Sequence, residues 1–254
     1  MTTLAADGVL RLLGATLLAF APGLAAADCN DIEFEGAAFT LCEAVAGDDL
    51  RLFLQDANGS THGSFARIEA ALEPQGETLV FAMNAGMYHP DRSPVGLYVE
   101  DAQEQRGVVT SAGPGNFGML PNGVFCIGAA DFAVIESRAF AEDPQACRHA
   151  TQSGPMLVID GELHPRFLPD STSAFLRNGV GVSDDGQRAV FAISNEPVTF
   201  HQFARLYRDH LGLSQALYFD GNVSRLHAPA LGRSDWGRPM GPIVALVRPA
   251  ENGS

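Results

Sequence analysis

Lysine is absent from this chain of 254 residues, whose 16 basic residues are all arginine. A P-loop needs its lysine to reach the phosphates of a nucleotide, and a Schiff base needs a lysine amine. Both chemistries are therefore excluded. Any phosphate must be held by arginine side chains, by backbone N–H groups or by a metal.

Positive charge is scarce overall, because 30 acidic residues give a net charge of -14 and a pI of about 4.7. Nucleic acids and anionic membrane surfaces are bound through basic patches, so neither is expected as a partner. A small anionic substrate is still compatible, since a few local arginines suffice to bind it. Charged residues make up only 18% of the chain and hydrophobic residues 46%, which predicts a folded protein with a sizeable core.

Recognisable metal and nucleophile motifs are missing as well. The sequence has no Cys-x-x-Cys and no His-Glu-x-x-His, and Asp184-Asp185-Gly186 is too short for a calcium loop. No cofactor is expected, and no spacing demands a metal; a divalent ion held by Asp220 and neighbouring acids is the open alternative. Ser153 lacks the first glycine of a Gly-x-Ser-x-Gly elbow, and the sequence does not assemble a Ser-His-Asp triad.

The N-terminus is typical of an export signal. Arg11 precedes an apolar run that is interrupted by glycine and proline and is short for a membrane span. Ala25-Ala26-Ala27 resembles a cleavage site. We expect residues 1–27 to be removed, leaving residues 28–254 as one periplasmic or secreted domain without membrane attachment. An uncleaved anchor is the alternative.

Four cysteines remain in the predicted mature chain, and an even count in an exported protein indicates disulfides. Four cysteines allow three pairings. We favour Cys29–Cys42 and Cys126–Cys147, because each pair closes a short local loop.

Apolar runs separated by turn residues predict an α+β fold, with mixed or antiparallel β-sheet and a few packed helices. Asp160-Gly161 is typical of a hairpin turn. Helical spacing of apolar residues predicts helices over residues 65–72 and 200–211, and Thr199 and Gln202 fit a capping box at the second helix. Strands are predicted at residues 39–41, 50–54, 78–83, 124–127, 132–135, 155–159, 179–183, 188–194, 217–219 and 243–247, and a further hairpin is predicted to join 96–100 to 108–110.

Polar residues and glycines gather where these apolar runs end, so their side chains could converge on one pocket. Each cluster alone is also ordinary turn chemistry. A carboxylate, a guanidinium, amides and a hydroxyl together are typical of a sugar or phosphate site. The clusters are Asn84-Ala-Gly-Met-Tyr88, Ala150-Thr-Gln-Ser-Gly-Pro155, Arg177-Asn-Gly-Val-Gly-Val182 and Ala216-Leu-Tyr-Phe-Asp-Gly221.

Taken in order, and together with Ser93-Pro-Val-Gly-Leu97, Asn116-Phe-Gly118 and Pro121-Asn-Gly-Val-Phe125, the clusters resemble the phosphodiester glycosidase family. That family includes the lysosomal enzyme that removes N-acetylglucosamine from mannose-6-phosphate diesters. The resemblance covers roughly residues 80–225. It implies an α+β domain that hydrolyses a sugar-1-phosphodiester, but it does not imply which substrate. We expect a carbohydrate phosphodiester of an envelope or extracellular glycan.

This chemistry assigns expected roles to the clustered residues. Hydrolysis at the anomeric carbon passes through an oxocarbenium-like state, and phosphate is a good leaving group, so the main needs are a carboxylate and a cation. We expect Asp220 to act as nucleophile or base and Arg177 to clamp the phosphate. Glu196 is the first choice for a second carboxylate and Asp91 the next. Sugar hydroxyls or phosphate oxygens would be bound by Asn84, Gln152, Ser153, Asn178 and Gly221.

Two other functions fit the same residues. A non-catalytic envelope glycan-binding protein would use the same polar pocket without cleaving its ligand. A phosphodiesterase would break the P–O bond of the same linkage instead of the C–O bond. Product release and labelled water distinguish these alternatives.

Overall fold

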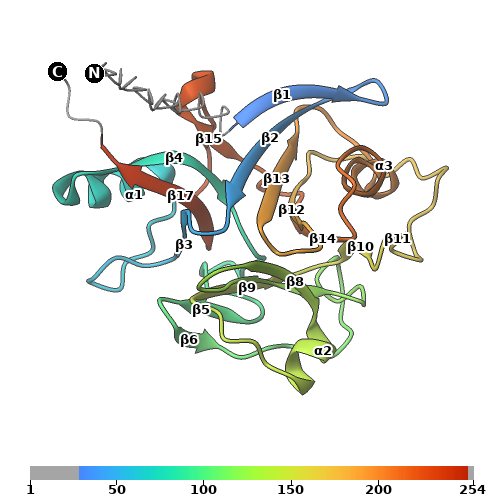
Figure 1. Cartoon of the computed structure of the whole chain (residues 1–254), viewed down its shortest axis with the longest axis horizontal. Helices are drawn as coiled ribbons and strands as arrows, with labels where there is room; N and C mark the ends of the chain where they lie inside the picture. The colour runs from blue at the N-terminus through green and yellow to red at the C-terminus, as the bar shows by residue number, and fades with distance from the viewer. Residues whose placement is uncertain (1–28, 251–254) are drawn as a thin grey trace, which may run out of the picture.

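Antiparallel strands form the scaffold of the protein in the computed structural model, which describes residues 29–250 (Figure 1). The strands make three sheets, and every pairing between named strands is antiparallel. A few short helices lie on the outside of the sheets. The predicted α+β class is confirmed.

The largest sheet has seven strands, and its order across the sheet differs from the order in the chain. The strands are β1 (Cys29–Phe34), β2 (Ala37–Val45), β13 (Arg188–Ser194), β12 (Asn178–Val182), β14 (Gln215–Asp220), β10 (Met156–Ile159) and β11 (Glu162–Leu163). Because β12 lies between β13 and β14, Asn178 at the start of β12 is paired with Asp220 at the end of β14. The topology thus brings two of the predicted polar clusters together.

The other two sheets have five strands each. The second contains β16 (Arg233–Ser234), β15 (Leu226–Ala228), β4 (Glu77–Asn84), β17 (Ile243–Pro249) and β3 (Asp49–Phe53). The third contains β6 (Gln103–Arg106), β5 (Tyr98–Glu100), β9 (His149–Ser153), β7 (Gly123–Ile127) and β8 (Phe132–Glu136).

A cluster of phenylalanines joins the three sheets in one core. Phe191 and Phe219 of the first sheet contact Phe125 of the third, with ring centroids 5.7 and 6.3 Å from it. Phe81 of the second sheet lies 5.3 Å from Phe191. All four side chains are buried, and aromatic pairs at these separations stabilise a core beyond the area that they bury.

Helices cover the outer faces of the sheets (Figure 1). Helix α1 (Phe65–Leu72) and the 3-10 turn η1 (Glu73–Gln75) pack on the second sheet, and α2 (Ser137–Glu142) packs beside the third. Helix α3 (Phe200–Arg205) continues into a π-helical turn, η2 (Leu206–His210), and buries Phe203 and Tyr207 against the first sheet. A 3-10 turn, η3 (Pro229–Leu231), follows β15.

Both predicted helices are confirmed. Helix α1 has the predicted bounds, and Ser64 caps it by accepting a hydrogen bond from the Arg67 amide. At α3 the Thr199 hydroxyl accepts from the Gln202 amide at 3.1 Å. The Gln202 carboxamide, however, donates to the carbonyl of Glu35, so only half of the capping box forms.

The predicted hairpin between residues 96–100 and 108–110 is wrong. Strand β5 pairs with β6, because Asp101 and Ala102 both adopt positive φ (47° and 60°) and turn the chain immediately. Val109 is not part of the ladder, because the Gln152 carboxamide forms hydrogen bonds with both the N–H and the carbonyl of Val109. Gln152 Oε1 accepts from Val109 N at 2.9 Å and Nε2 donates to Val109 O at 2.6 Å.

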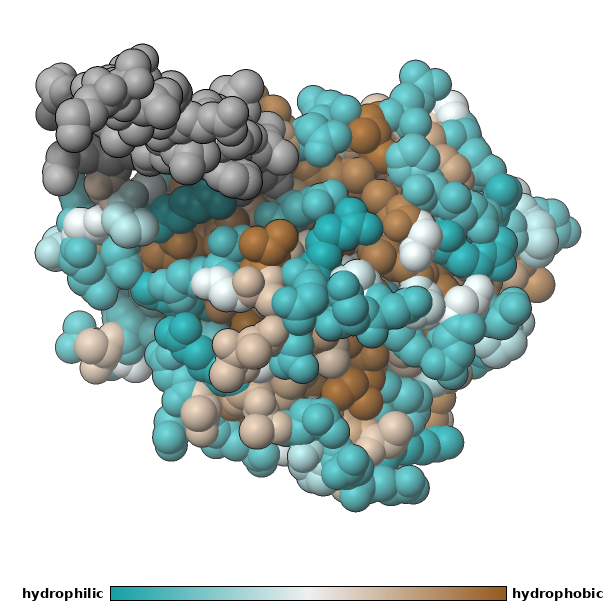
Figure 2. Space-filling view, in the orientation of Figure 1, coloured by the Kyte–Doolittle hydropathy of each residue, from teal (hydrophilic) through white to brown (hydrophobic). Residues whose placement is uncertain are grey.

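Both predicted disulfides are present. Cys29 and Cys42 face one another across β1 and β2, and Cys126 on β7 joins Cys147, shortly before β9. The predicted signal peptide lies outside the described residues. Within residues 29–250 no helix has the length and apolar character needed to cross a bilayer. The face drawn in Figure 2 is mostly hydrophilic, with hydrophobic residues visible between the polar ones.

Candidate active site

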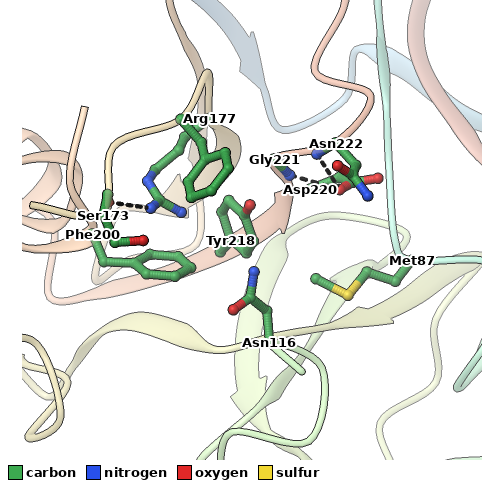
Figure 3. A pocket seen from close by; sticks show the side chains of 10 residues that line it. Met87, Asn116, Ser173, Arg177, Phe200, Tyr218, Asp220, Gly221 and Asn222 are labelled. Carbon is green, nitrogen blue, oxygen red and sulfur yellow. Dashed lines mark hydrogen bonds between the residues drawn. The ribbon is translucent and has the colours of Figure 1, made fainter. Parts of the chain in front are cut away.

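A cavity of about 320 Å³ lies where β14 ends (Figure 3). Its walls come from β14 and the turn after it, from the extended segment before β12, from α3 and from the loop that carries Asn116. The lining residues are Met87, Asn116, Ser173, Phe175, Arg177, Phe200, Tyr218, Asp220, Gly221 and Asn222. In Figure 3, Tyr218 lies between Asp220 on one side and Arg177 with Phe200 on the other.

Asp220 is the carboxylate of this cavity and the last residue of β14. The chain turns directly after it, so the amides of Gly221 and Asn222 both donate to its Oδ1, at 2.6 and 2.8 Å. Oδ2 has no hydrogen-bond partner within residues 29–250. Burial raises the pKa of Asp220, and the two amides oppose that shift only in part. One oxygen is thus fixed, while the other is available to a ligand.

Arg177 is a buried cation, with 1% of its surface exposed. Its Nε donates to the Val198 carbonyl at 2.8 Å and its Nη2 to the Ser173 carbonyl at 3.1 Å. The guanidinium lies 3.6 Å from the ring centroid of Phe200, a close cation–π contact. No carboxylate within residues 29–250 forms an ion pair with it, and burial lowers its pKa. The site therefore holds an uncompensated positive charge in a fixed position.

The Tyr218 phenol completes the polar lining. Its hydroxyl is buried and makes no hydrogen bond within the described part of the chain. Burial raises the pKa of Tyr218, against the opposing attraction of nearby Arg177. Gly221 makes room for this hydroxyl, because a Cβ at position 221 would overlap it. The phenol therefore stays protonated and can donate a hydrogen bond to a ligand.

Asn84 and Asn178 bind one another instead of lining the cavity. Asn84 Nδ2 donates to Asn178 Oδ1 at 3.1 Å, and Asn178 Nδ2 donates to the Asn84 carbonyl at 2.8 Å. Asn84 Oδ1 also accepts from the Arg225 amide at 2.8 Å. Both side chains are buried, so this pair links the end of β4 to the start of β12. The pair does not line the cavity, but it holds together two of the strands next to it.

Gln152 and Ser153 are also buried behind the cavity. The Gln152 carboxamide contacts Leu97, Val109 and Ser137, and thereby fixes the loops around β9. Ser153 Oγ donates to the carbonyl of Phe219 at 2.8 Å. Because Phe219 precedes Asp220, this bond helps to place the end of β14.

The two candidates for a second carboxylate lie elsewhere. Glu196 is exposed, and its Oε1 accepts from the Ala38 amide at 2.9 Å, near the start of β2. Asp91 is exposed in its own turn, where Ser93 donates to its Oδ1. Neither residue lines the cavity, and Asp220 is the only acidic residue among the described ones that does.

Seven of the ten lining residues have no role assigned from the sequence: Met87, Asn116, Ser173, Phe175, Phe200, Tyr218 and Asn222. Tyr218 precedes Asp220 by two positions on a strand, so both side chains face the same side, and this spacing could have identified it. Phe200 was assigned to the apolar stripe of the helix, and no local signal places it over Arg177. Asn116 belongs to a motif that carried the family resemblance, without an assigned role. Within residues 29–250 no group of three or more His, Cys, Asp or Glu side chains is placed to hold a metal ion.

Solved structures share this fold. The catalytic domain of zebrafish N-acetylglucosamine-1-phosphodiester alpha-N-acetylglucosaminidase, auto-inhibited by its pro-peptide, superimposes with a TM-score of 0.56 at 12% identity, covering 86% of this chain and 81% of that one. A protein of Burkholderia pseudomallei K96243 gives 0.50 at 11% identity, covering 83% and 74%. At these identities the likeness concerns the fold alone.

The amino-acid sequence is also similar to a curated protein and to a family profile. The uncharacterized protein YigE of Escherichia coli (strain K12) is 33% identical over 204 residues, which cover 80% of this chain and 78% of YigE. The sequence profile of the phosphodiester glycosidase family matches residues 77–230, a stretch that contains both Arg177 and Asp220. Since that match spans more than half of the chain, the protein belongs to the phosphodiester glycosidase family.

Proposed function

We propose that the protein hydrolyses a sugar-1-phosphodiester at the glycosidic C–O bond to phosphate. The observation that carries the proposal is one cavity lined by two charged groups: a buried arginine without an acidic partner among residues 29–250, and a carboxylate with a raised pKa. A glycosyl phosphodiester needs a cation at the phosphate and a carboxylate at the anomeric carbon. Family membership supports the same class of reaction.

Arg177 is the group that would hold the phosphate. A cation that is buried without a partner has lost its hydration, and a bound anion restores a favourable interaction. Phe200 and the carbonyls of Ser173 and Val198 already hold the guanidinium in position, so little side-chain entropy remains to be lost on binding. Tyr218 would add a hydrogen bond to a phosphate oxygen or a sugar hydroxyl.

Asp220 would provide the carboxylate, either as nucleophile or as base for a water molecule. Its raised pKa makes it a stronger base than an ordinary aspartate, and its fixed Oδ1 leaves Oδ2 for the reaction. A departing phosphate needs no proton from the enzyme, which fits a cavity whose lining holds one acidic residue among those described. The bond broken is C1–O, and water supplies the new oxygen on the sugar.

The proposed place of action is the periplasm or the extracellular space, on a glycan that contains phosphodiesters. Two disulfides fit an oxidising compartment. Removal of residues 1–27 and a mature domain from residue 28 to 254 belong to this proposal.

Release of free sugar from UDP-N-acetylglucosamine and from the methyl diester of N-acetylglucosamine 1-phosphate tests the proposal. We expect wild type to release the sugar and Asp220→Asn to lose about a thousandfold in kcat/KM or more. Glu196→Gln and Asp91→Asn are matched controls, and both should stay within about twofold of wild type, because neither carboxylate lines the cavity.

The same assay separates the alternatives. In labelled water, C–O cleavage places the solvent oxygen on the sugar, whereas a phosphodiesterase would place it on the phosphate. Binding without release of product would favour a glycan-binding protein instead. Full activity in Asp220→Asn would overturn the assigned role of that residue.

A further inference from the structure

A second and larger hollow, of about 710 Å³, lies beside the proposed active site. The two hollows share a wall. Phe175 and Arg177 line the first, and Leu176 between them lines the second. Ser224 Oγ lies 2.8 Å from the carbonyl of Asp220 and 3.2 Å from that of Leu176, and so joins this wall to the turn after the proposed catalytic carboxylate. The two hollows therefore lie on either side of one segment of chain, and a ligand that fills both must cross it.

Trp236 stands at this second hollow with 94% of its surface exposed. Leu176 and Phe175, on the wall between the hollows, are 42% and 51% exposed. Single exposed hydrophobic residues are common, but an almost fully exposed tryptophan in a hollow that also holds an exposed leucine is typical of a binding surface. A flat indole face suits the C–H face of a sugar ring, which is the part of a carbohydrate that gains most from leaving water.

Arg225 supplies positive charge to the same hollow. It forms no ion pair with a carboxylate within residues 29–250. Its Nη1 donates to the Arg238 carbonyl at 2.6 Å, and its guanidinium packs so closely on Gly237 that a Cβ there would overlap it. Gly237 and Arg238 directly follow Trp236, so the arginine also holds the loop that presents the indole.

The other charged groups in this hollow neutralise one another. Arg233 forms an ion pair with Asp235 at 2.8 Å and also donates to Asn195 at 2.7 Å. The lining therefore carries one uncompensated positive charge, that of Arg225, in a protein whose net charge is -14. A bound group that suits this balance is an anion.

We propose that the second hollow binds the part of the substrate beyond the scissile phosphate: a sugar ring stacked on Trp236 and a second anionic group paired with Arg225. The inference rests on the proposed function and specifies its substrate class. The substrate is then a glycan with successive anionic sugar units, such as sugar phosphates, and not a simple alkyl phosphodiester. Arg177 holds the phosphate at the reacting carbon, and Arg225 holds the next anion along the chain.

Three diesters of N-acetylglucosamine 1-phosphate test this proposal: with methanol, with glucose, and with glucose that carries a phosphate of its own. We expect kcat/KM of the wild type to rise by about tenfold for the glucose and again by about tenfold for the second phosphate. Trp236→Leu should abolish the first gain. Arg225→Gln should abolish the second gain and also reduce the first, because Arg225 holds the loop that presents Trp236. Arg67→Gln removes a charge from the exposed face of helix α1 and should leave both gains intact.

The methyl diester provides the control for misfolding, because it does not reach the second hollow. Both variants should hydrolyse it within about twofold of wild type. The proposal is overturned if both gains persist in the variants, or if the variants lose the same factor on all three diesters.

Tryptophan fluorescence tests the hollow independently of catalysis, because Trp236 is the only tryptophan in the chain. In Asp220→Asn, the phosphorylated glucose diester should produce a saturable change in emission that Arg225→Gln weakens by about tenfold. If wild type cleaves none of the diesters, the proposed function fails, and this titration still decides the second hollow. An emission that stays constant up to millimolar diester would refute the inference.

Discussion

Burial favours the neutral form of both ionisable groups of the cavity, Asp220 and Arg177. It raises the pKa of Asp220 and lowers that of Arg177. Neither residue has an ion-pair partner within the described residues, although each is fixed by hydrogen bonds to backbone groups. Such a site is less stable when empty than a paired one, and its stabilisation would come from the substrate. Under the proposed function, the two residues would serve the reaction at the expense of the stability of the fold.

The raised pKa of Asp220 makes a prediction about stability and pH. A folded-state pKa above the unfolded value means that the folded protein binds the proton more tightly, so its stability falls as the pH rises between the two values. Asp220→Asn lacks this titration. We expect the variant to be more stable than wild type near pH 7, with a difference that shrinks as the pH falls towards about 4. Urea midpoints across this range measure it.

A difference that stays the same at every pH would contradict this reasoning, since it would arise from packing and not from the proton. Asp91→Asn is the control. That carboxylate is exposed and accepts hydrogen bonds from Ser93, which lower its pKa. Its replacement should lack the stabilisation that we expect for Asp220→Asn.

At the scale of single elements, local chemistry was sufficient to predict much of the fold. The turn at Asp160-Gly161 and the capped helix that begins at Phe65 depend on neighbours in the chain, and both are confirmed. The predicted hairpin between residues 96–100 and 108–110 is wrong, because the side chain of a distant residue, Gln152, hydrogen-bonds to the backbone of Val109. A side chain that replaces a strand partner leaves no trace in hydrophobic periodicity.

The amide pair between Asn84 and Asn178 gives a prediction for two joined elements. Asn178→Ala leaves the Asn84 Nδ2 group and the Asn84 carbonyl buried without this partner, which should cost about 1–3 kcal/mol of unfolding free energy. The double variant with Asn84→Ala should cost less than the sum of the two single variants, because the pair is lost only once. Urea denaturation of the four proteins measures the coupling.

A different result would support the substrate-binding role that the sequence predicts for Asn84 and Asn178. Variants with unchanged urea midpoints and a raised KM would show that the amides contact substrate. Ser93→Ala is a suitable reference, since it removes a polar group from an exposed turn outside the cavity.

The site as a whole could not be assembled from the sequence. Asp220 and Arg177 each belong to a cluster with glycine at a strand end, and the order β13-β12-β14 brings those ends together. Asn84, Gln152 and Ser153 satisfy the same local pattern, yet they bond to other elements behind the cavity. Residue types alone do not distinguish a polar group that awaits a ligand from one already paired within the protein.

The disulfide between Cys126 and Cys147 gives a prediction about the stability of the whole molecule. Cys126 and Cys147 are 21 residues apart, and closing a loop of that length should contribute about 3 kcal/mol by restricting the unfolded chain. We expect the Cys126→Ser/Cys147→Ser variant to lose that much unfolding free energy while it retains activity at 25 °C, because neither cysteine lines the cavity. Treatment of wild type with dithiothreitol should lower its thermal midpoint, and the same reagent should shift the variant less. Equal shifts would mean that this disulfide contributes no stability, and loss of activity in a folded variant would mean that the third sheet positions the site more directly than its contacts indicate.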